Sequence, residues 1–219
     1  MFIGHFAPAL VAAARPQTAG LGTLFVAAQL VDIGFAALLM TGTEAMRIVP
    51  GFTAMNPMDL YHMPYTHSLL GALMWGALFG ALVWAATRRR AAAIAAMLVV
   101  VSHWFLDLVV HSPDLTLFGA PPMLGLGLWN HPAIAMPLEI ALIGGALLYY
   151  ARHTQAPSGN RRLWLLAGVL AVAQAVDWFG AQHTAYSLAI PATMLAAYAL
   201  LAAAAAWAGA DRHPAPEYA

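Results

Sequence analysis

The sequence has 219 residues, of which 62% are hydrophobic and only 8% are charged, whereas soluble domains carry roughly 25% charged residues. This composition indicates a polytopic membrane protein. The formal net charge is zero, so the chain offers no basic surface for nucleic acid. There is no cysteine, which excludes disulfides, thiolate metal sites and cysteine nucleophiles. Any metal ligands must therefore be histidine, carboxylate, carbonyl or water.

Apolar stretches between polar breaks predict one all-α integral membrane domain over residues 1–219. The first stretch ends at Arg15-Pro16 and covers only about 21 Å, less than the roughly 30 Å hydrocarbon core, so residues 1–16 are predicted to form a half-helix. Six full spans follow within 17–208, and they are predicted at 18–40, 65–86, 91–111, 133–150, 163–181 and 186–208. The segments 41–64 and 112–132 are predicted loops, and residues 209–219 a frayed tail.

Arginine placement orients this bundle. All arginines except Arg47 fall on one side of a six-span topology: Arg15, Arg88, Arg89, Arg90, Arg152, Arg161, Arg162 and Arg212. The positive-inside rule predicts that this side, with both termini, is cytoplasmic.

Four ionisable residues mark the third span and its end: His103, Asp107, His111 and Asp114. On an α-helix their spacing of four, four and three residues places them within an arc of about 80°. Ionisable groups on a membrane helix are costly unless they face protein, water or an ion. A single His–Asp pair could simply join two helices through a hydrogen bond. Four groups on one stripe favour a functional site.

Ionisable residues on the other segments fall at a similar depth. By helical rise, His103 lies about 18 Å and His111 about 30 Å above the cytoplasmic start of the third span. The residues expected near this level are Asp32, His62, His67, His131, Glu139, Asp177 and His183. The inner halves of the spans are almost entirely apolar. The sequence thus predicts a polar cluster in the outer half of the bilayer.

Histidine and carboxylate without cysteine suit a divalent transition metal, with Zn²⁺ first and Mn²⁺ or Fe²⁺ as alternatives. We predict that His67, His103 and Asp107 share one ion, with His62 or Asp32 as a further ligand and His5 behind them. The ion would activate water. Asp32 and His111 are the predicted catalytic groups for general acid–base chemistry.

Each outlying residue also has a structural interpretation. Thr66 could cap the second span, with His62 and His67 wetted at the interface. Asp32 could form an interhelical hydrogen-bonding pair with Gln29. Glu139 could cap the bundle, and Asp177 could form a separate pair with Gln174 and His183.

Several of these motifs form a pattern along the first half of the chain: Gly4-His5, Val31-Asp32, His62-Met-Pro-Tyr-Thr-His67-Ser68-Leu69-Leu70 and Ser102-His103-x-x-x-Asp107. The pattern resembles the bacterial membrane-bound metal-dependent hydrolases of the LexA-regulated inner-membrane type, a group more distantly similar to zinc-dependent phospholipase C. The resemblance implies a location in the bacterial inner membrane. It also implies six candidate metal ligands: His5, Asp32, His62, His67, His103 and Asp107. In that family a second Asp and a His follow the first Asp, whereas Ile33, Gly34 and Phe35 follow Asp32 here.

The leading functional hypothesis is an integral-membrane metal-dependent hydrolase that lies among membrane lipids and acts near the outer leaflet, on a lipid phosphoester or another small molecule. A transporter or permease that moves ions or protons through the same cluster is the main alternative. A b-type haem protein with His67 and His103 as axial ligands is a third hypothesis. A structural or assembly protein with an inactive site is the fourth.

Overall fold

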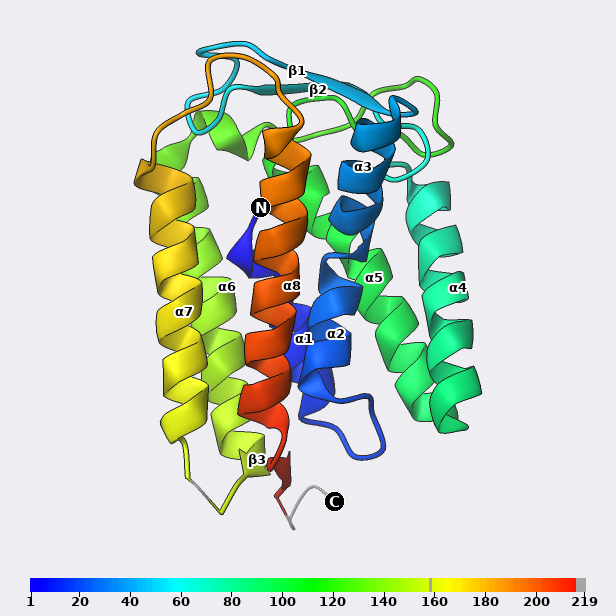
Figure 1. Ribbon diagram of the computed structural model, residues 1–219, viewed down its shortest axis with the longest axis vertical. Coiled ribbons are helices and arrows are strands. Elements are labelled where there is room, and N and C mark those ends of the chain that lie inside the picture. Colours follow the sequence, from blue (N-terminus) through cyan, green and yellow to red (C-terminus); the bar gives the residue numbers. More distant parts are fainter. Residues whose placement is uncertain (158, 216–219) are drawn as a thin grey trace.

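The computed structural model describes residues 1–157 and 159–215, and it is a bundle of long apolar helices (Figure 1). The five longest helices can each span a membrane: α4 (Leu69–Thr87), α5 (Arg90–Val110), α6 (Pro132–His153), α7 (Arg161–Phe179) and α8 (Ala189–Gly209). The pair α2 (Leu21–Ala28) and α3 (Leu30–Thr41) forms a sixth span if it is counted as one bent helix. The predicted all-α membrane bundle of about six spans is therefore confirmed.

The N-terminal segment lies inside this bundle. The 3₁₀ turn η1 (Ile3–His5) leads into α1 (Phe6–Ala13), and Figure 1 places the N-terminus in the upper part of the bundle, between the surrounding helices. The Glu139 carboxylate on α6 accepts the backbone N–H groups of Phe2 at 2.6 Å and Gly4 at 2.9 Å. These donors would otherwise have no partner, because the first N–H groups of a helix have no acceptor within it. Residue 1 thus lies within the bundle and not at either end of it, which the distribution of arginines did not foresee.

The first predicted span is bent by 54° between α2 and α3. Neither proline nor glycine stands at the break. Instead Gln29, only 1% exposed, leaves the helical conformation and its side chain donates to the Phe2 carbonyl. A side chain that bonds to another segment is a recognised cause of helix kinks. The bend places Asp32 in the first turn of α3.

The predicted loop at 41–64 contains a β-hairpin instead. Strand β1 (Ala45–Ile48) pairs antiparallel with β2 (Met58–His62), and the hairpin covers the end of the bundle opposite the C-terminus (Figure 1). Arg47 Nε lies 2.5 Å from Asp59 Oδ2 across the two strands. The hairpin thus forms a cover over the polar half of the molecule.

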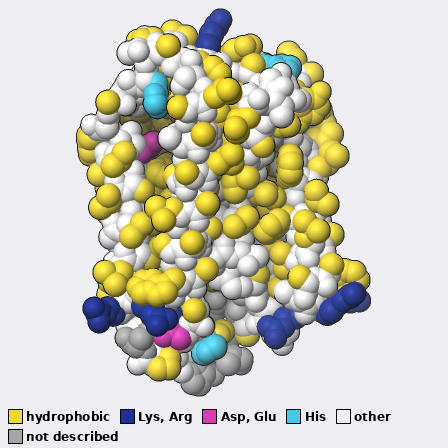
Figure 2. All heavy atoms as spheres, viewed as in Figure 1, with side chains coloured by type: hydrophobic (Ala, Val, Ile, Leu, Met, Phe, Trp, Pro, Cys, Tyr) yellow, Lys and Arg dark blue, Asp and Glu magenta, His cyan; other side chains and the backbone are white. Residues whose placement is uncertain are grey.

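The other end of the bundle carries most arginines and the C-terminal segment. Figure 2 shows arginine side chains gathered at the lower end, with one at the upper end. Strand β3 (Thr154–Gln155) pairs with β4 (His213–Pro214), and Arg212 between them is only 8% exposed. The tail predicted to be frayed from residue 209 is therefore ordered to residue 215, and positions 216–219 lie outside the described residues.

Apolar packing fills the arginine-rich half. Phe6 and Phe25 stack with ring centroids 4.3 Å apart, and Leu10 and Leu24 beside them are fully buried. Gly22 lets α2 approach α8 closely, since a Cβ there would lie 2.5 Å from the Cβ of Ala206. The two halves of the bundle thus differ sharply in chemistry, and the ionisable residues gather above this core.

Candidate metal centre

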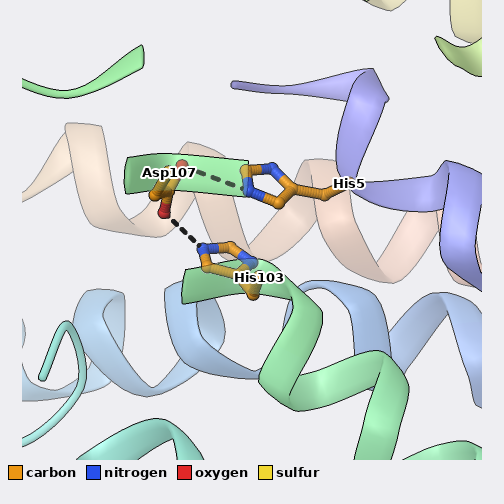
Figure 3. Close-up of side chains that lie close together, drawn as sticks. All are labelled: His5, His103 and Asp107. Carbon is orange, nitrogen blue, oxygen red and sulfur yellow. Dashed lines mark ion pairs between the residues drawn. The ribbon is translucent and has the colours of Figure 1, made fainter. Parts of the chain in front are cut away.

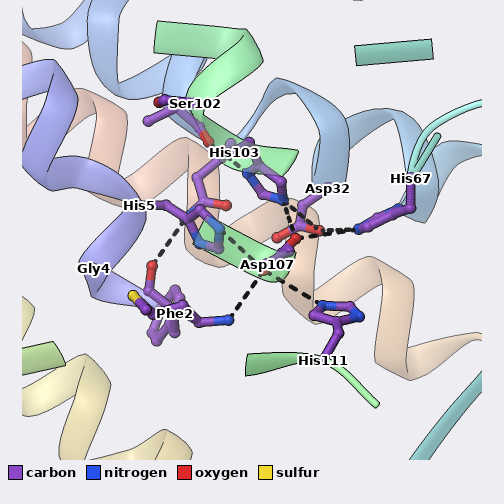
Figure 4. A network of polar contacts seen from close by, with 12 residues as sticks. Phe2, Gly4, His5, Asp32, His67, Ser102, His103, Asp107 and His111 are labelled. Atoms are coloured by element: carbon purple, nitrogen blue, oxygen red, sulfur yellow. Dashed lines mark hydrogen bonds and ion pairs between the residues drawn. The ribbon is translucent and has the colours of Figure 1, made fainter. Parts of the chain in front are cut away.

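Six ionisable side chains from five segments meet in the interior, as Figure 4 shows. They are His5 of η1, Asp32 of α3, His67 before α4, His103 and Asp107 of α5, and His111 directly after α5. Five of the six are at most 3% exposed, and Asp32 is half-buried. Three overlapping groups within this cluster could hold a metal ion: His5, His103 and Asp107; Asp32, His67 and His103; and His67, Asp107 and His111.

Asp107 lies at the centre of the cluster. On α5 it stands one turn from both His103 and His111, as the four-residue spacing requires. Its Oδ2 lies 2.9 Å from His103 Nε2, and its Oδ1 lies 3.4 Å from His111 Nε2. Figure 3 shows the same carboxylate beside the rings of His5 and His103, with an ion pair to each. Because its two oxygens point in different directions, Asp107 divides the cluster into two sides.

The Oδ2 side has the dimensions of a tetrahedral ion site. His67 Nε2 lies 3.7 Å from Asp107 Oδ2 and 3.4 Å from Asp32 Oδ1. His103 Nε2 lies 2.9 Å from Asp107 Oδ2 and 3.6 Å from Asp32 Oδ1. Ligand bonds of about 2.1 Å to a tetrahedral ion imply ligand–ligand separations of about 3.4 Å. These four atoms come from the two helices α3 and α5 and from the segment before α4, and their spacing matches that of one ion site.

The Oδ1 side holds a second set of groups. His5 Nε2 lies 3.1 Å and the Met1 amino group 3.2 Å from Asp107 Oδ1, and His111 Nε2 also faces this oxygen. The rings of His5 and His103 stack with centroids 3.9 Å apart. Both sides of Asp107 thus consist of nitrogen and oxygen atoms that can bind a cation.

The other ring nitrogens of three histidines are already engaged. His103 Nδ1 lies 2.8 Å from the Ala28 carbonyl at the end of α2, and His111 Nδ1 lies 2.9 Å from Asp114 Oδ1. Both partners are acceptors, so both Nδ1 atoms carry the proton. Nε2 of each ring faces the cluster and can bind an ion there once it carries no proton. Metal-binding histidines are usually held in this way by a carbonyl or carboxylate.

His67 is oriented through a relay that begins in the turn before the hairpin. The buried Glu44 carboxylate accepts the Thr66 hydroxyl at 2.6 Å and the backbone N–H groups of Tyr65 and Thr66. Thr66 Oγ1 lies 2.9 Å from His67 Nδ1. Its single proton goes to Glu44, so Thr66 must accept from His67 Nδ1–H. In this tautomer the lone pair is on His67 Nε2, and this atom faces Asp32 and Asp107.

Buried nitrogens without hydrogen bonds are one sign that the cluster could hold a cation. His5 Nδ1, His5 Nε2 and His103 Nε2 are inaccessible to solvent, and their contacts do not have hydrogen-bond geometry. Buried polar atoms in proteins nearly always have a partner, and a site for an ion is one of the common explanations when they do not. A divalent ion beside Asp107 would give His103 Nε2 a partner.

The electrostatic field in the cluster also favours positive charge. Burial by itself lowers the pKa of His111, but the Asp107 and Asp114 carboxylates outweigh this effect and raise it to about 9. Negative charge thus dominates at His111. A field that stabilises an imidazolium also stabilises a bound metal cation.

Some predicted site residues lie elsewhere. His62 is exposed on β2 and belongs to none of the groups that could hold an ion within the described part of the chain. Residues two apart on a strand normally share a face, so His62 would be buried like Leu60. The alternation ends there, and Tyr61 and His62 are both exposed. His131 is also exposed, and Glu139 is occupied by the N-terminal turn.

The structure adds residues that sequence reasoning did not assign to the site. Glu44 carried no recognisable signal, because it stands in a predicted loop 22 residues before Thr66. In the alternative structural interpretation Thr66 caps the second span, but Ser68 takes that role by accepting the Gly71 N–H at 3.0 Å. This leaves the Thr66 hydroxyl for His67. Asp114 was placed on the stripe, and it orients His111.

A cavity of about 530 Å³ adjoins the cluster. Its polar wall includes Asp32, His67, Asp107 and His111. Its apolar walls come from the hairpin and from facing parts of α7 and α8, and they include Met58, Leu60, Val176, Ile190 and Met194. The volume lies within the range of small-molecule sites, which is about 300 to 1,000 Å³.

Comparisons with known proteins found no match, so the geometry of the cluster is the main evidence for its function. No protein-family model matches the chain. No curated protein and no solved structure matches it either. The site defines the class only as far as an integral-membrane protein whose buried histidines and aspartates could hold a metal ion.

Proposed function

We propose that this protein is an integral-membrane metal-dependent hydrolase whose substrate enters from the lipid phase. One observation carries the proposal: four nitrogen and oxygen atoms have tetrahedral spacing, and three of their residues, Asp32, His67 and Asp107, line a 530 Å³ cavity. A structural polar cluster would need neither the open cavity nor the unpaired nitrogens. The resemblance of its motifs to membrane-bound metal-dependent hydrolases points to the same chemistry.

Asp32, His67, His103 and Asp107 would hold the ion, with Zn²⁺ as the first choice and Mn²⁺ or Fe²⁺ as alternatives. A divalent ion there supplies Lewis-acid chemistry for hydrolysis. Asp32 serves better as a ligand than as the base proposed from the sequence. Its Oδ1 faces two histidines, and its Oδ2 accepts the Tyr198 hydroxyl at 3.0 Å.

His111 is the group we assign to proton transfer. It lines the cavity, its ring lies against Trp129 with centroids 4.2 Å apart, and Asp114 holds its far nitrogen. An imidazole held between two carboxylates can keep or release a proton at Nε2, as general acid–base catalysis requires. It is thus suited to protonate a leaving group in the cavity.

The transporter hypothesis is less well supported. A permease needs polar groups that continue from one face to the other. Here the core on the arginine-rich side of the cluster is built from Phe6, Leu10, Leu24 and Phe25, each at most 1% exposed. The cluster is therefore accessible from one half of the bundle only.

We further propose that the hairpin end faces away from the cytoplasm in a bacterial inner membrane, because all arginines except Arg47 lie toward the other end. A reporter enzyme fused after Gly119, in the segment between α5 and α6, should then behave as exported. A fusion after Gly159, between α6 and α7, should behave as cytoplasmic. The reverse pattern would place the metal centre in the cytoplasmic leaflet.

Metal analysis of the purified protein tests the central claim. We expect about one divalent transition-metal ion per chain or more, less than about a tenth of that in His103→Ala, and no change in the matched control His62→Ala, whose side chain is exposed. Loaded wild type should also cleave lipids in vesicles of bacterial lipid extract, as read by mass spectrometry. Wild type that contains no metal and gains none from added Zn²⁺ or Mn²⁺ would refute the proposal.

A further inference from the structure

We infer that the cavity selects an amphiphile with an amine in its head group, a phospholipid of the ethanolamine type, which enters sideways between α7 and α8. This inference rests on the proposed function, since it assigns the substrate class of the same site. Three observations carry it: the lateral position of the cavity, the charge of its walls, and the exposure of the Asp177 carboxylate in the cavity.

The cavity reaches the lipid-facing side of the bundle between two helix ends. Its lining includes Ala173, Val176 and Asp177 near the end of α7, and Ile190 and Met194 near the start of α8. Figure 1 shows these ends at the same height, joined by a loop that arches over them. On α7, Val176 is 66% and Phe179 74% exposed, as is typical of residues that face lipid. A chain with an apolar tail can therefore reach the cavity from within the bilayer.

The walls of this cavity are acidic. Four carboxylates line it, those of Asp32, Asp107, Glu139 and Asp177, and no arginine or lysine is among the described lining residues. A divalent ion held by Asp32 and Asp107 would balance these two charges. Glu139 and Asp177 add two further negative charges, of which the Met1 ammonium offsets one, so the cavity remains negative. Such a cavity repels a substrate with net negative charge and attracts one that also carries a cation.

Asp177 is the carboxylate that remains open to a ligand. Glu139 is 4% exposed and is occupied by two backbone N–H groups. The Asp177 side chain, by contrast, is exposed in the cavity, and its Oδ2 accepts one hydrogen bond, from Gln174 Nε2 at 3.0 Å. Figure 2 shows an acidic side chain at the surface between α7 and α8, at the height where Figure 1 places the N-terminus.

Asp177 stands two residues before the end of α7, and a carboxylate there is stabilised by a cationic partner. An ammonium group is the partner that matches it in charge, and it can donate up to three hydrogen bonds. In a phospholipid of the ethanolamine type the ammonium is joined to the phosphate by a two-carbon link. We expect one such molecule to place its phosphate near the metal centre, its ammonium at Asp177 and its acyl chains between α7 and α8, because all three groups adjoin the same cavity.

The test compares two lysolipids with the same acyl chain, lysophosphatidylethanolamine and lysophosphatidylglycerol. Their binding to metal-loaded protein in a nonionic detergent is measured by native mass spectrometry. We expect wild type to bind the ethanolamine lipid about tenfold more tightly, as one partly buried charge pair implies. Asp177→Asn should reduce this ratio below about twofold and keep its metal. The matched control Asp211→Asn, at the opposite end of the bundle, should keep the full ratio.

A change on the ligand side removes any dependence on how the variant folds. N-acetylation of lysophosphatidylethanolamine abolishes the ammonium, and wild type should then bind it no better than the glycerol lipid. Equal binding of the three lipids by wild type, or a full ratio in Asp177→Asn, would overturn the inference. Metal content and hydrolysis without any head-group preference would leave the proposed hydrolase standing. Head-group preference without metal or hydrolysis would instead refute the hydrolase.

Discussion

Two buried polar clusters lie toward opposite ends of this bundle, and they are built differently. Around Arg212 every group has a fixed partner: Nε donates to Thr154 Oγ1 at 3.0 Å, Nη2 to the Thr154 carbonyl, and Nη1 to Asn160 Oδ1 and the Gly159 carbonyl. The guanidinium also lies 5.3 Å from the centre of the Tyr150 ring. In the His/Asp cluster, by contrast, buried histidine nitrogens converge without hydrogen bonds.

The difference indicates that the Arg212 cluster stabilises the fold, whereas the His/Asp cluster could bind a metal ion. A charged group in an apolar core is tolerated when its donors have acceptors. All three guanidinium nitrogens of Arg212 donate to an acceptor, and the cluster joins β3 to β4. In the His/Asp cluster, Nδ1 of His103, His67 and His111 contacts Ala28, Thr66 and Asp114, respectively. The Nε2 atoms of the same three rings face one another and the two aspartates. Matched partners on one side and unmatched lone pairs on the other are the signature of an ion site.

The largest expected effect follows from the central position of Asp107. Asp107→Ala removes the one carboxylate that contacts both sides of the cluster, and we expect it to abolish metal binding entirely. His5→Ala alters only the Oδ1 side and should keep at least one ion per chain. Metal content by mass spectrometry of detergent-purified protein measures both. Equal loss in the two variants would show that the sides of Asp107 are not separate.

The relay behind His67 should matter less, but measurably. Thr66→Val removes the hydroxyl that accepts His67 Nδ1–H, and loss of such a partner typically weakens metal affinity by about 10 to 100-fold. Glu44→Gln should have a similar effect, because it acts through the same hydroxyl. Competition with a chelator gives the affinity. Thr87→Val at the far end of α4 is the control, and an equal loss there would contradict a role specific to Thr66.

For the Arg212 cluster we expect the opposite result. Arg212→Ala leaves the Thr154 and Gly159 carbonyls without their donor, and it should lower the free energy of unfolding by about 3 kcal/mol. Metal content per folded chain should not change. Thermal unfolding in detergent measures the loss, with the exposed Arg90→Ala as the control. Metal loss in Arg212→Ala would show that the two clusters depend on each other.

The apolar half provides the smallest effect. Gly22→Ala would bring a Cβ within 2.5 Å of the Ala206 side chain and 2.9 Å of its backbone, so α2 and α8 must separate. Overpacking of this kind costs about 2 kcal/mol. Gly168→Ala on α7 meets no atom within 4 Å and should cost nothing, or stabilise the helix slightly. Comparison of the two melting temperatures tests whether close packing of α2 on α8 supports this half.

The sequence by itself determined the spans and the stripe on α5. Span positions depend on local hydropathy over about 20 residues, and the His103–Asp107–His111 row depends on helical period alone, so both can be read without knowledge of the fold. Depth along the helices also predicted that Asp32 and His67 lie near this row. The half-helix was recognisable because 14 apolar residues are too few to cross the membrane.

Only the tertiary structure decided which groups meet. The 54° bend at Gln29 brings Asp32 in, and it depends on a hydrogen bond to Phe2 from a segment 27 residues away in the chain. The Glu44 relay depends on how the chain folds back before the hairpin, and the same hairpin leaves His62 exposed although its spacing from His67 suggested a ligand. Contacts of this kind arise from packing between segments, and local periodicity carries no information about them.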